Sequence, residues 1–134
     1  MKLKIYTDGG ARGNPGNAGI GVYITDENGR EIEKRYKNIG IKTNNDAEYT
    51  AVYLALTRAV ELGYKDIDLF SDSSLVVNQL SSNRKIKEDR LKIYKADIDK
   101  IIKENKLKVS FNWIKREDNK EADRLSNVAM DEKK

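Results

Sequence analysis

The fold is decided by residues 2–30, KLKIYTDGGARGNPGNAGIGVYITDENGR. Two segments in this stretch, residues 2–8 and 19–25, are short, apolar and β-branched, as is typical of strands. The second segment places one set of alternating side chains on a single face: Ile20, Val22 and Ile24. Glycine, proline and asparagine between them, at 9–17, predict a turn-rich loop.

A second connection follows at residues 26–29, DENG, which is typical of a hairpin turn. The segment after it, about 30–39, is more polar and is predicted to be a third strand. Because each connection is short, the three strands should form an antiparallel meander.

The hydrophobic period then changes from two to nearly four. Positions 48, 52, 55, 59 and 62 form one stripe of a helix over 45–62, and Gly63 is a stop signal. Further elements are predicted at 66–72 (strand), 73–80 (serine-capped helix), 88–104 (helix), 107–113 (strand) and 119–130 (helix). The pattern predicts an α/β fold with a five-stranded mixed sheet, its first three strands antiparallel, and helices on both faces.

The 134 residues are expected to form a single domain, residues 1–134, with a frayed tail at about 131–134. The chain has neither cysteine nor histidine, which excludes disulfides, thiolate metal sites and an imidazole base. Carboxylates are left as the chemical groups of a hydrolase, and a metal held by them should be hard, such as magnesium or manganese.

The net charge of +4 is unevenly distributed, because residues 84–116 carry 12 Lys or Arg against 5 Asp or Glu. Such a cluster fits either a polyanionic partner or a solvated helical surface. The sequence has no run of about 20 apolar residues and no signal-like N-terminus. We therefore expect a soluble, cytoplasmic protein without membrane contact.

Three carboxylates occupy unexpected places. Glu48 lies on the apolar stripe of its helix, so a cation should face its buried charge. The alternative is that Glu48 lies at the solvent-exposed end of the stripe, where the dipole of the helix N-terminus stabilises the charge. Asp8 and Asp72 each follow an apolar strand, and they would be adjacent if those strands are neighbours. A fourth acid is available near the last helix, where spacing alone leaves three candidates open: Asp118, Glu121 and Asp123.

Four motifs carry a resemblance to a known family: YTDGGARGNPG at 6–16, TNNDAEYTAVYLAL at 43–56, LFSDSSLVVNQL at 69–80 and NKEADRLSNVA at 119–129. Together, in this order, they resemble the type 1 ribonuclease H family over nearly the whole chain. The resemblance implies a ribonuclease H-like fold and an endonuclease that hydrolyses the RNA strand of RNA/DNA hybrids, leaving 5′-phosphate and 3′-hydroxyl ends.

The resemblance also implies the site residues. Asp8, Glu48, Asp72 and Asp123 would be the catalytic carboxylates and would hold two Mg²⁺ ions, with Mn²⁺ as a substitute. The implied substrate-binding residues are Gly9, Arg12, Asn14, Lys42, Thr43, Asn44, Asn45 and Ser74.

These substrate roles differ in kind. The asparagines, Asn14, Asn44 and Asn45, would meet the minor groove of the hybrid, although Asn44 or Asn45 could equally cap the helix. The glycine loop allows a close approach of its backbone to RNA. Thr43, with Lys42 beside it, would hold a phosphate of the DNA strand.

The chain departs from the family in three respects. It lacks the histidine that many members carry before the fourth acid, for which Lys115, Arg116 or Glu117 are partial substitutes. It also lacks a long basic protrusion, which Arg84, Lys85 and Lys87 would replace in reduced form. Ser74 stands where glutamine is frequent, and Trp113 is expected in the core rather than as a nucleic-acid stacking platform.

Three other functions are alternatives to this one: a related nuclease for double-stranded RNA or DNA, a binding module without catalysis, and a switch domain phosphorylated on aspartate. Four intact acids argue against a mere binder, since negative charge repels phosphate. The opening meander argues against the regular βα alternation of a switch domain. The expected partner is the hybrid duplex, with the chain a monomer that needs no protein partner.

Overall fold

The computed structural model describes residues 1–81, 86 and 88–132. Its elements are β1 (Lys2–Arg12), β2 (Gly16–Asp26), β3 (Glu31–Lys42), α1 (Asn44–Leu62), β4 (Asp66–Ser71), α2 (Ser74–Ser81), α3 (Asp89–Glu104), β5 (Lys108–Trp113), a short 3₁₀ turn (Arg116–Asp118) and α4 (Lys120–Asp131). The five strands form one sheet in the order β3-β2-β1-β4-β5.

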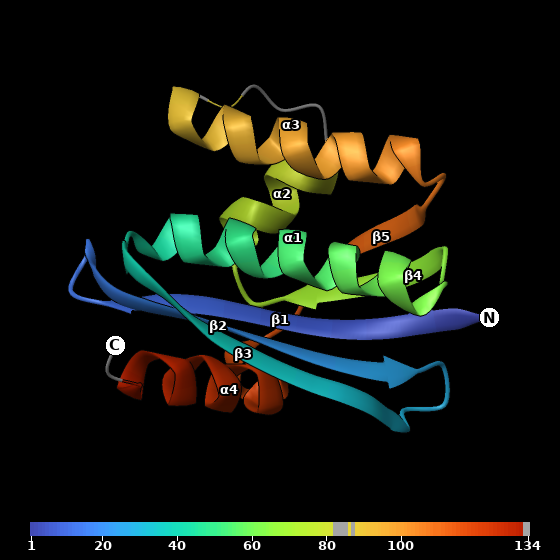
Figure 1. Ribbon diagram of the computed structural model, residues 1–134, viewed down its shortest axis with the longest axis horizontal. Coiled ribbons are helices and arrows are strands. Elements are labelled where there is room, and N and C mark those ends of the chain that lie inside the picture. Colours follow the sequence, from blue (N-terminus) through green and yellow to red (C-terminus); the bar gives the residue numbers. More distant parts are fainter. Residues whose placement is uncertain (82–85, 87, 133–134) are drawn as a thin grey trace.

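Helices cover both faces of this sheet. Figure 1 shows α1 against one face with α2 and α3 beyond it, and α4 alone against the other. The strands β1, β2 and β3 pair antiparallel, whereas β4 pairs parallel with both β1 and β5. The predicted fold class is therefore confirmed, and the first and fourth strands, whose pairing the sequence left open, are neighbours.

The predicted loop at 9–17 is much shorter than expected. β1 and β2 stay paired through Gly9↔Ile20 to Arg12↔Asn17, so that only residues 13–15 form the turn. Gly9 and Gly10 thus lie within β1, and Gly16 begins β2. At Gly9 the reason for glycine is steric, because a Cβ there would lie 2.4 Å from the backbone of Ala47 in α1.

α1 ends at Gly63 as the sequence predicts, and it begins at Asn44, one residue before the predicted start. Thr43 caps its N-terminus in a capping box with Asp46, and Gly63 ends it in the left-handed conformation at φ 85°. The stripe predicted for its buried face packs on the sheet, and its apolar members join the main core with Leu3, Ile5, Ile67 and Leu69. This core fixes the position of the first turns of α1 over β1.

The other face of the sheet accepts α4 at very short range. Two glycines of β2 make this possible, since a Cβ on Gly21 would lie 2.3 Å from the Ala122 carbonyl oxygen and one on Gly19 only 2.7 Å from Ala129. The helix extends to Asp131, and the Glu132 carbonyl still accepts a bond from Asn38. Residues 133 and 134 of the predicted frayed tail lie outside the described residues.

The prediction that Trp113 lies in the core is wrong. The side chain is 53% exposed, although Val109 and Phe111 on the same face of β5 pack against the core. β5 is an edge strand and Trp113 is its last residue, paired with Ser71 at the end of the ladder. Alternation along the strand predicted the correct face, but not that the burial stops before its end.

Candidate active site

Two aspartates mark the place where two neighbouring strands separate. The parallel ladder between β1 and β4 ends at Thr7↔Ser71, and Asp8 and Asp72 come directly after this pair. Asp8 does not end its strand, because β1 continues along β2 as far as Arg12. The opening beyond the parallel ladder is the usual ligand position of such sheets.

Glu48 completes a cluster of three carboxylates. It projects from the second turn of α1, and its side chain is 8% exposed. Asp8, Glu48 and Asp72 each offer an oxygen that lies within 4.8 Å of the others. The three acids that the apolar pattern singled out therefore meet in one place. No ion pair joins Glu48 to a lysine or arginine among the residues that the structure describes.

The backbone of Gly9 holds two of these acids together. Its N–H donates to Glu48 Oε1 at 2.5 Å and lies 3.0 Å from Asp8 Oδ1. A side chain at position 9 would collide with Ala47 and Glu48 backbone atoms. Gly9 is thus needed here for the close contact of a strand with a helix.

Two further side chains orient the aspartates. Ser126 Oγ donates to Asp8 Oδ2 at 3.1 Å, and Asn119 Nδ2 lies 3.4 Å from Asp72 Oδ2 while it donates to the Thr7 carbonyl at 2.9 Å. Both side chains are 1% exposed. Neither residue was predicted as part of the site, although both lie in the fourth motif. Their spacing in the sequence does not distinguish a polar side chain that is buried against a site carboxylate from one on the surface.

The electrostatics of the cluster are those of uncompensated negative charge. Burial, and then the charge of Asp72, raises the pKa of Asp8 to about 7. Burial and the charge of Asp8 raise the pKa of Glu48 well above its ordinary value, although the Gly9 N–H opposes this shift. The pKa of Asp72 is raised by burial as well. Among the charged groups that the structure describes, only Arg116 is seen to oppose these shifts, at Asp72, so the cluster is suited to a bound cation.

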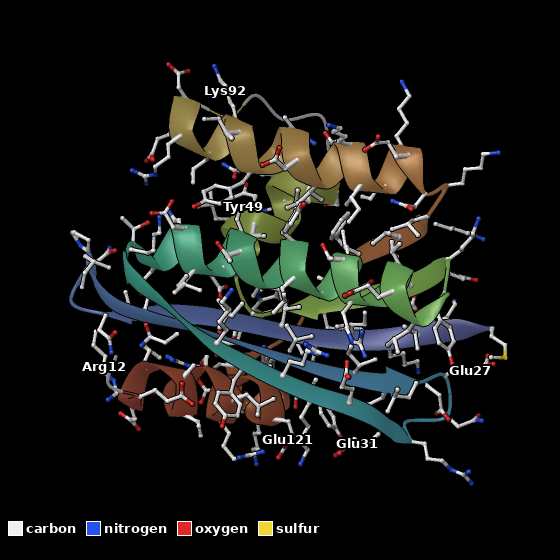
Figure 2. All side chains as sticks on the ribbon, in the orientation of Figure 1. Arg12, Glu27, Glu31, Tyr49, Lys92 and Glu121 are labelled. Carbon is white, nitrogen blue, oxygen red and sulfur yellow. The ribbon has the colours of Figure 1, made fainter. Side chains whose placement is uncertain are left out.

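The three candidates for the fourth acid lie at different places relative to the cluster. The charge of Asp123 acts on both Asp8 and Asp72, so Asp123 lies at the rim of the cluster, with its side chain 33% exposed. Glu121 instead pairs with Arg124 at 3.0 Å and with Lys34 at 3.5 Å. Figure 2 shows Glu121 close to Glu31 on the outer side of α4. Asp118 lies at a separate pocket on that same side.

An open groove of ≈ 510 Å³ runs past the cluster. Its lining is Asp8, Gly9, Gly10, Ala11, Arg12, Asn44, Asn45, Glu48, Asp72, Ser73, Arg116, Asn127 and Met130. The structure thus brings four of the predicted substrate residues, Gly9, Arg12, Asn44 and Asn45, to the same groove as three of the acids.

The asparagines link the start of α1 to the β1–β2 hairpin. Asn44 Oδ1 accepts from the Ala11 N–H at 2.8 Å, and Asn14 Oδ1 accepts from the Asn44 N–H at 3.0 Å. Neither Asn44 nor Asn45 caps the helix, since Thr43 does so. The capping alternative is therefore wrong.

The remaining predicted substrate residues lie around the groove. Thr43 caps α1 and Lys42 is exposed at the end of β3, while Ser74 is exposed at the start of α2. Arg12, at the far end of the β1–β2 hairpin in Figure 2, forms an ion pair with Asp131.

The segment before α4 presents exposed charges to the site. Arg116 NH2 lies 3.6 Å from Asp123 Oδ1, and the neighbouring Lys115 and Glu117 are exposed. Of the proposed replacements for the missing histidine, Arg116 is thus the one with a contact to a site carboxylate. The basic residues Arg84, Lys85 and Lys87 lie outside the described residues.

Comparison with known proteins gives this geometry a family. The sequence model of the family described as "Reverse transcriptase-like" matches residues 6–129. A bifunctional protein of Mycobacterium tuberculosis is 39% identical over 133 residues, which are 98% of this chain and 36% of the relative. The chain thus spans about a third of the length of that relative.

Two solved structures match over nearly their full length. A ribonuclease H1 isolated from compost, solved in complex with an RNA/DNA hybrid, is 44% identical with a TM-score of 0.92, covering 96% of both chains. The ribonuclease H1 of Halobacterium salinarum is 32% identical with a TM-score of 0.91, covering 98% of both. Fold and carboxylate cluster together define a ribonuclease H-like protein. The chain belongs to the ribonuclease H family, and the described part of it contains no helix long and apolar enough to cross a membrane.

Proposed function

We propose that this protein is an endonuclease that hydrolyses the RNA strand of RNA/DNA hybrids and leaves 5′-phosphate and 3′-hydroxyl ends. The observation that carries the proposal is the buried cluster of Asp8, Glu48 and Asp72, with which no lysine or arginine of the described residues forms an ion pair. The cluster lines an open groove of ≈ 510 Å³, and a relative of the same family is known in complex with a hybrid.

The donor set fits hard divalent ions. Carboxylate oxygens are the ligands that Mg²⁺ and Mn²⁺ prefer, and the raised pKa values of all three acids would fall once a cation neutralised them. Asp8, Glu48, Asp72 and Asp123 would hold two such ions, preferably Mg²⁺. When bound, two metal ions activate a water and stabilise the leaving oxygen of a phosphodiester.

The protein itself contributes orientation. Gly9, Asn119 and Ser126 each hold a carboxylate through a hydrogen bond, so that the site changes little when substrate arrives. Asp123 is more exposed than Asp8 and Glu48, and it contacts Arg116. We infer that this pair takes the place of the absent histidine, with the carboxylate moving between the site and solvent as product leaves.

The amides beside the cluster support the hybrid as substrate. Asn44 and Asn45 line the groove, and Asn14 is tied to Asn44. Amide groups can meet both base edges and 2′-hydroxyls in the wide minor groove of such a duplex. Lys42, at the end of β3, and Thr43, the N-cap of α1, directly precede Asn44 and would then hold a phosphate of the DNA strand.

The test is a cleavage assay with end-labelled substrates. The purified protein is incubated with an RNA/DNA hybrid, duplex RNA, duplex DNA and single-stranded RNA, each with Mg²⁺, Mn²⁺ or chelator. We expect metal-dependent cutting confined to the RNA of the hybrid. Cutting of duplex RNA or DNA would change the substrate, and tight binding without cutting would favour an inactive binding module.

A matched pair of variants tests the fourth acid. Asp123→Asn should reduce cleavage by about 10²-fold or more, since it removes a metal ligand. Glu121→Gln, two residues away on the same helix, should leave cleavage unchanged, because Glu121 pairs with Lys34 and Arg124 away from the groove. The reverse result would exchange the roles of the two acids.

A further inference from the structure

The exposed indole of Trp113 is unexplained by the fold. Trp113 is the only tryptophan of the chain and is 53% exposed at the end of an edge strand. A side chain of this size gains much from burial, so an exposed one on a rigid strand often marks a binding surface.

The indole is fixed beside the carboxylate cluster. Its Nε1–H donates to the backbone carbonyl of Asp72 at 3.2 Å. Its strand partner is Ser71, and Ser73 on the other side of Asp72 lines the groove. The flat apolar ring is thus held at the edge of the groove, within one residue of a proposed metal ligand.

Positive charge continues from the indole along the chain. Lys115 and Arg116 follow it closely, and both are exposed. An aromatic surface flanked by cations is the combination that proteins use to hold a nucleic-acid strand, with apolar contact from the ring and phosphate contact from the cations.

We propose that Trp113 is a substrate-binding residue that packs against the sugar of the RNA strand next to the scissile phosphate. The proposal rests on the proposed function. It assigns the RNA strand because the strand that is cut must pass Asp72, to whose carbonyl the indole is bonded. The contact is with a sugar because the bases of a duplex are stacked inside it. The sugar is then the apolar surface of the strand that the indole can reach.

A purely structural role would give a different result. If the indole served only to hold Asp72 through its N–H, then Trp113→Phe and Trp113→Ala would be equally harmful, because both remove the donor. If the ring face binds substrate, Trp113→Phe retains most of the contact and Trp113→Ala loses it.

Fluorescence tests the contact without any substitution of Trp113. The single tryptophan is observed while a hybrid is titrated into the Glu48→Gln variant, which prevents cutting. We expect a saturable change in intensity and emission maximum. The control carries Trp113→Phe together with Ile32→Trp. Ile32 is 38% exposed near the β2–β3 turn on β3, the edge strand opposite to β5, and should report no change.

Steady-state kinetics then separate binding from positioning. Trp113→Ala should raise KM for the hybrid by about 5- to 20-fold with kcat within twofold, as loss of one ring contact implies. Trp113→Phe should stay close to the wild type. An equal loss of kcat in both variants, or an unchanged tryptophan spectrum in saturating hybrid, would overturn the proposal while the cleavage activity stood. Absence of cleavage by the wild type would instead refute the proposed function, and the fluorescence titration would still decide whether the indole meets the hybrid.

Discussion

Asp8 and Glu33 are both carboxylates on the sheet, and their surroundings shift their pKa values in opposite directions. Arg58 Nε donates to Glu33 at 2.6 Å and a second guanidinium nitrogen donates at 2.9 Å, which lowers the pKa of Glu33 to about 2. Asp8 lies instead beside Asp72 and Glu48, and burial together with the charge of Asp72 raises its pKa to about 7. One carboxylate has its cation within the protein and the other lacks it.

The difference shows which acids serve the fold and which serve a ligand. A carboxylate that supports a fold is paired with a cation of the same chain, as Glu33 is. A group of buried acids held in place by Gly9, Asn119 and Ser126, without a cation, costs folding free energy that a bound metal ion would return. The predictions below test this contrast.

The largest effect should follow from removing a carboxylate of the cluster. Asp72→Asn should lower the rate of hybrid cleavage by about 10³-fold or more, because it removes a proposed metal ligand. The fold should stay intact, since the substitution also relieves charge repulsion. Circular dichroism and a cleavage assay would measure both, with Glu33→Gln as the control that retains activity. Normal magnesium-dependent turnover by the variant would refute the two-metal assignment.

The next effect should come from the backbone that joins two acids of the cluster. Gly9→Ala should destabilise the protein by about 2–3 kcal/mol and displace Glu48, since the new Cβ would lie 2.4 Å from Ala47 backbone atoms. Gly10→Ala is the matched control, because its Cβ would come no nearer than 3.6 Å to any neighbour. Urea unfolding of both variants would measure the difference. Equal stability would mean that α1 can move away from β1 at little cost.

Much of this architecture could be predicted from local patterns. Alternation predicted the antiparallel strands, and the stripe that starts at Glu48 predicted which face of α1 is buried. Glu48 is recognisable because a charge on an apolar stripe violates the pattern around it, and Asp8 and Asp72 because each directly follows an apolar strand. Their meeting in one place required only that the first and fourth strands be neighbours.

What could not be predicted depends on contacts between distant segments. The glycines at 9–10 signalled a loop, but the structure uses them within a strand that passes close to α1. Asn119 and Ser126 have ordinary helix-end and helix positions in the sequence, and only the packing of α4 on β1 brings them to Asp72 and Asp8. Trp113 continues the alternation of apolar residues along β5, but Phe111 is the last of them that packs against the core.

A smaller effect concerns stability in the absence of metal. The folded protein holds a proton on Asp8 up to about pH 7, whereas the unfolded chain releases it near the ordinary value of 3.8. Stability conferred by this group is therefore complete below about pH 4 and is lost as the pH rises to 7. In chelator, the free energy of unfolding of Asp8→Asn should increasingly exceed that of the wild type as the pH rises through this range, by on the order of 2 kcal/mol at pH 7.

Thermal unfolding from pH 4 to pH 8, with chelator and with Mg²⁺, would measure this gain. Mg²⁺ should raise the stability of the wild type more than that of the variant, since it supplies the missing cation. A gain that did not change with pH would show that the carboxylate of Asp8 is not the group responsible.

The smallest effect should come from the carboxylate whose cation is already present. Glu33 titrates near pH 2 when folded and near 4.5 when unfolded, so its contribution is complete above pH 4.5 and is lost as the pH falls toward 2. Because the pair is close to solvent, Glu33→Gln should cost only a few tenths of a kcal/mol at pH 7 and nothing near pH 2. Glu27→Gln, at the hairpin tip shown in Figure 2, is the matched control. Urea unfolding at the two pH values, in low and in high salt, would measure a cost that salt reduces. A cost as large as that expected for Gly9→Ala, about 2–3 kcal/mol, would mean that the Glu33–Arg58 pair is far better shielded from water than its position on the sheet implies.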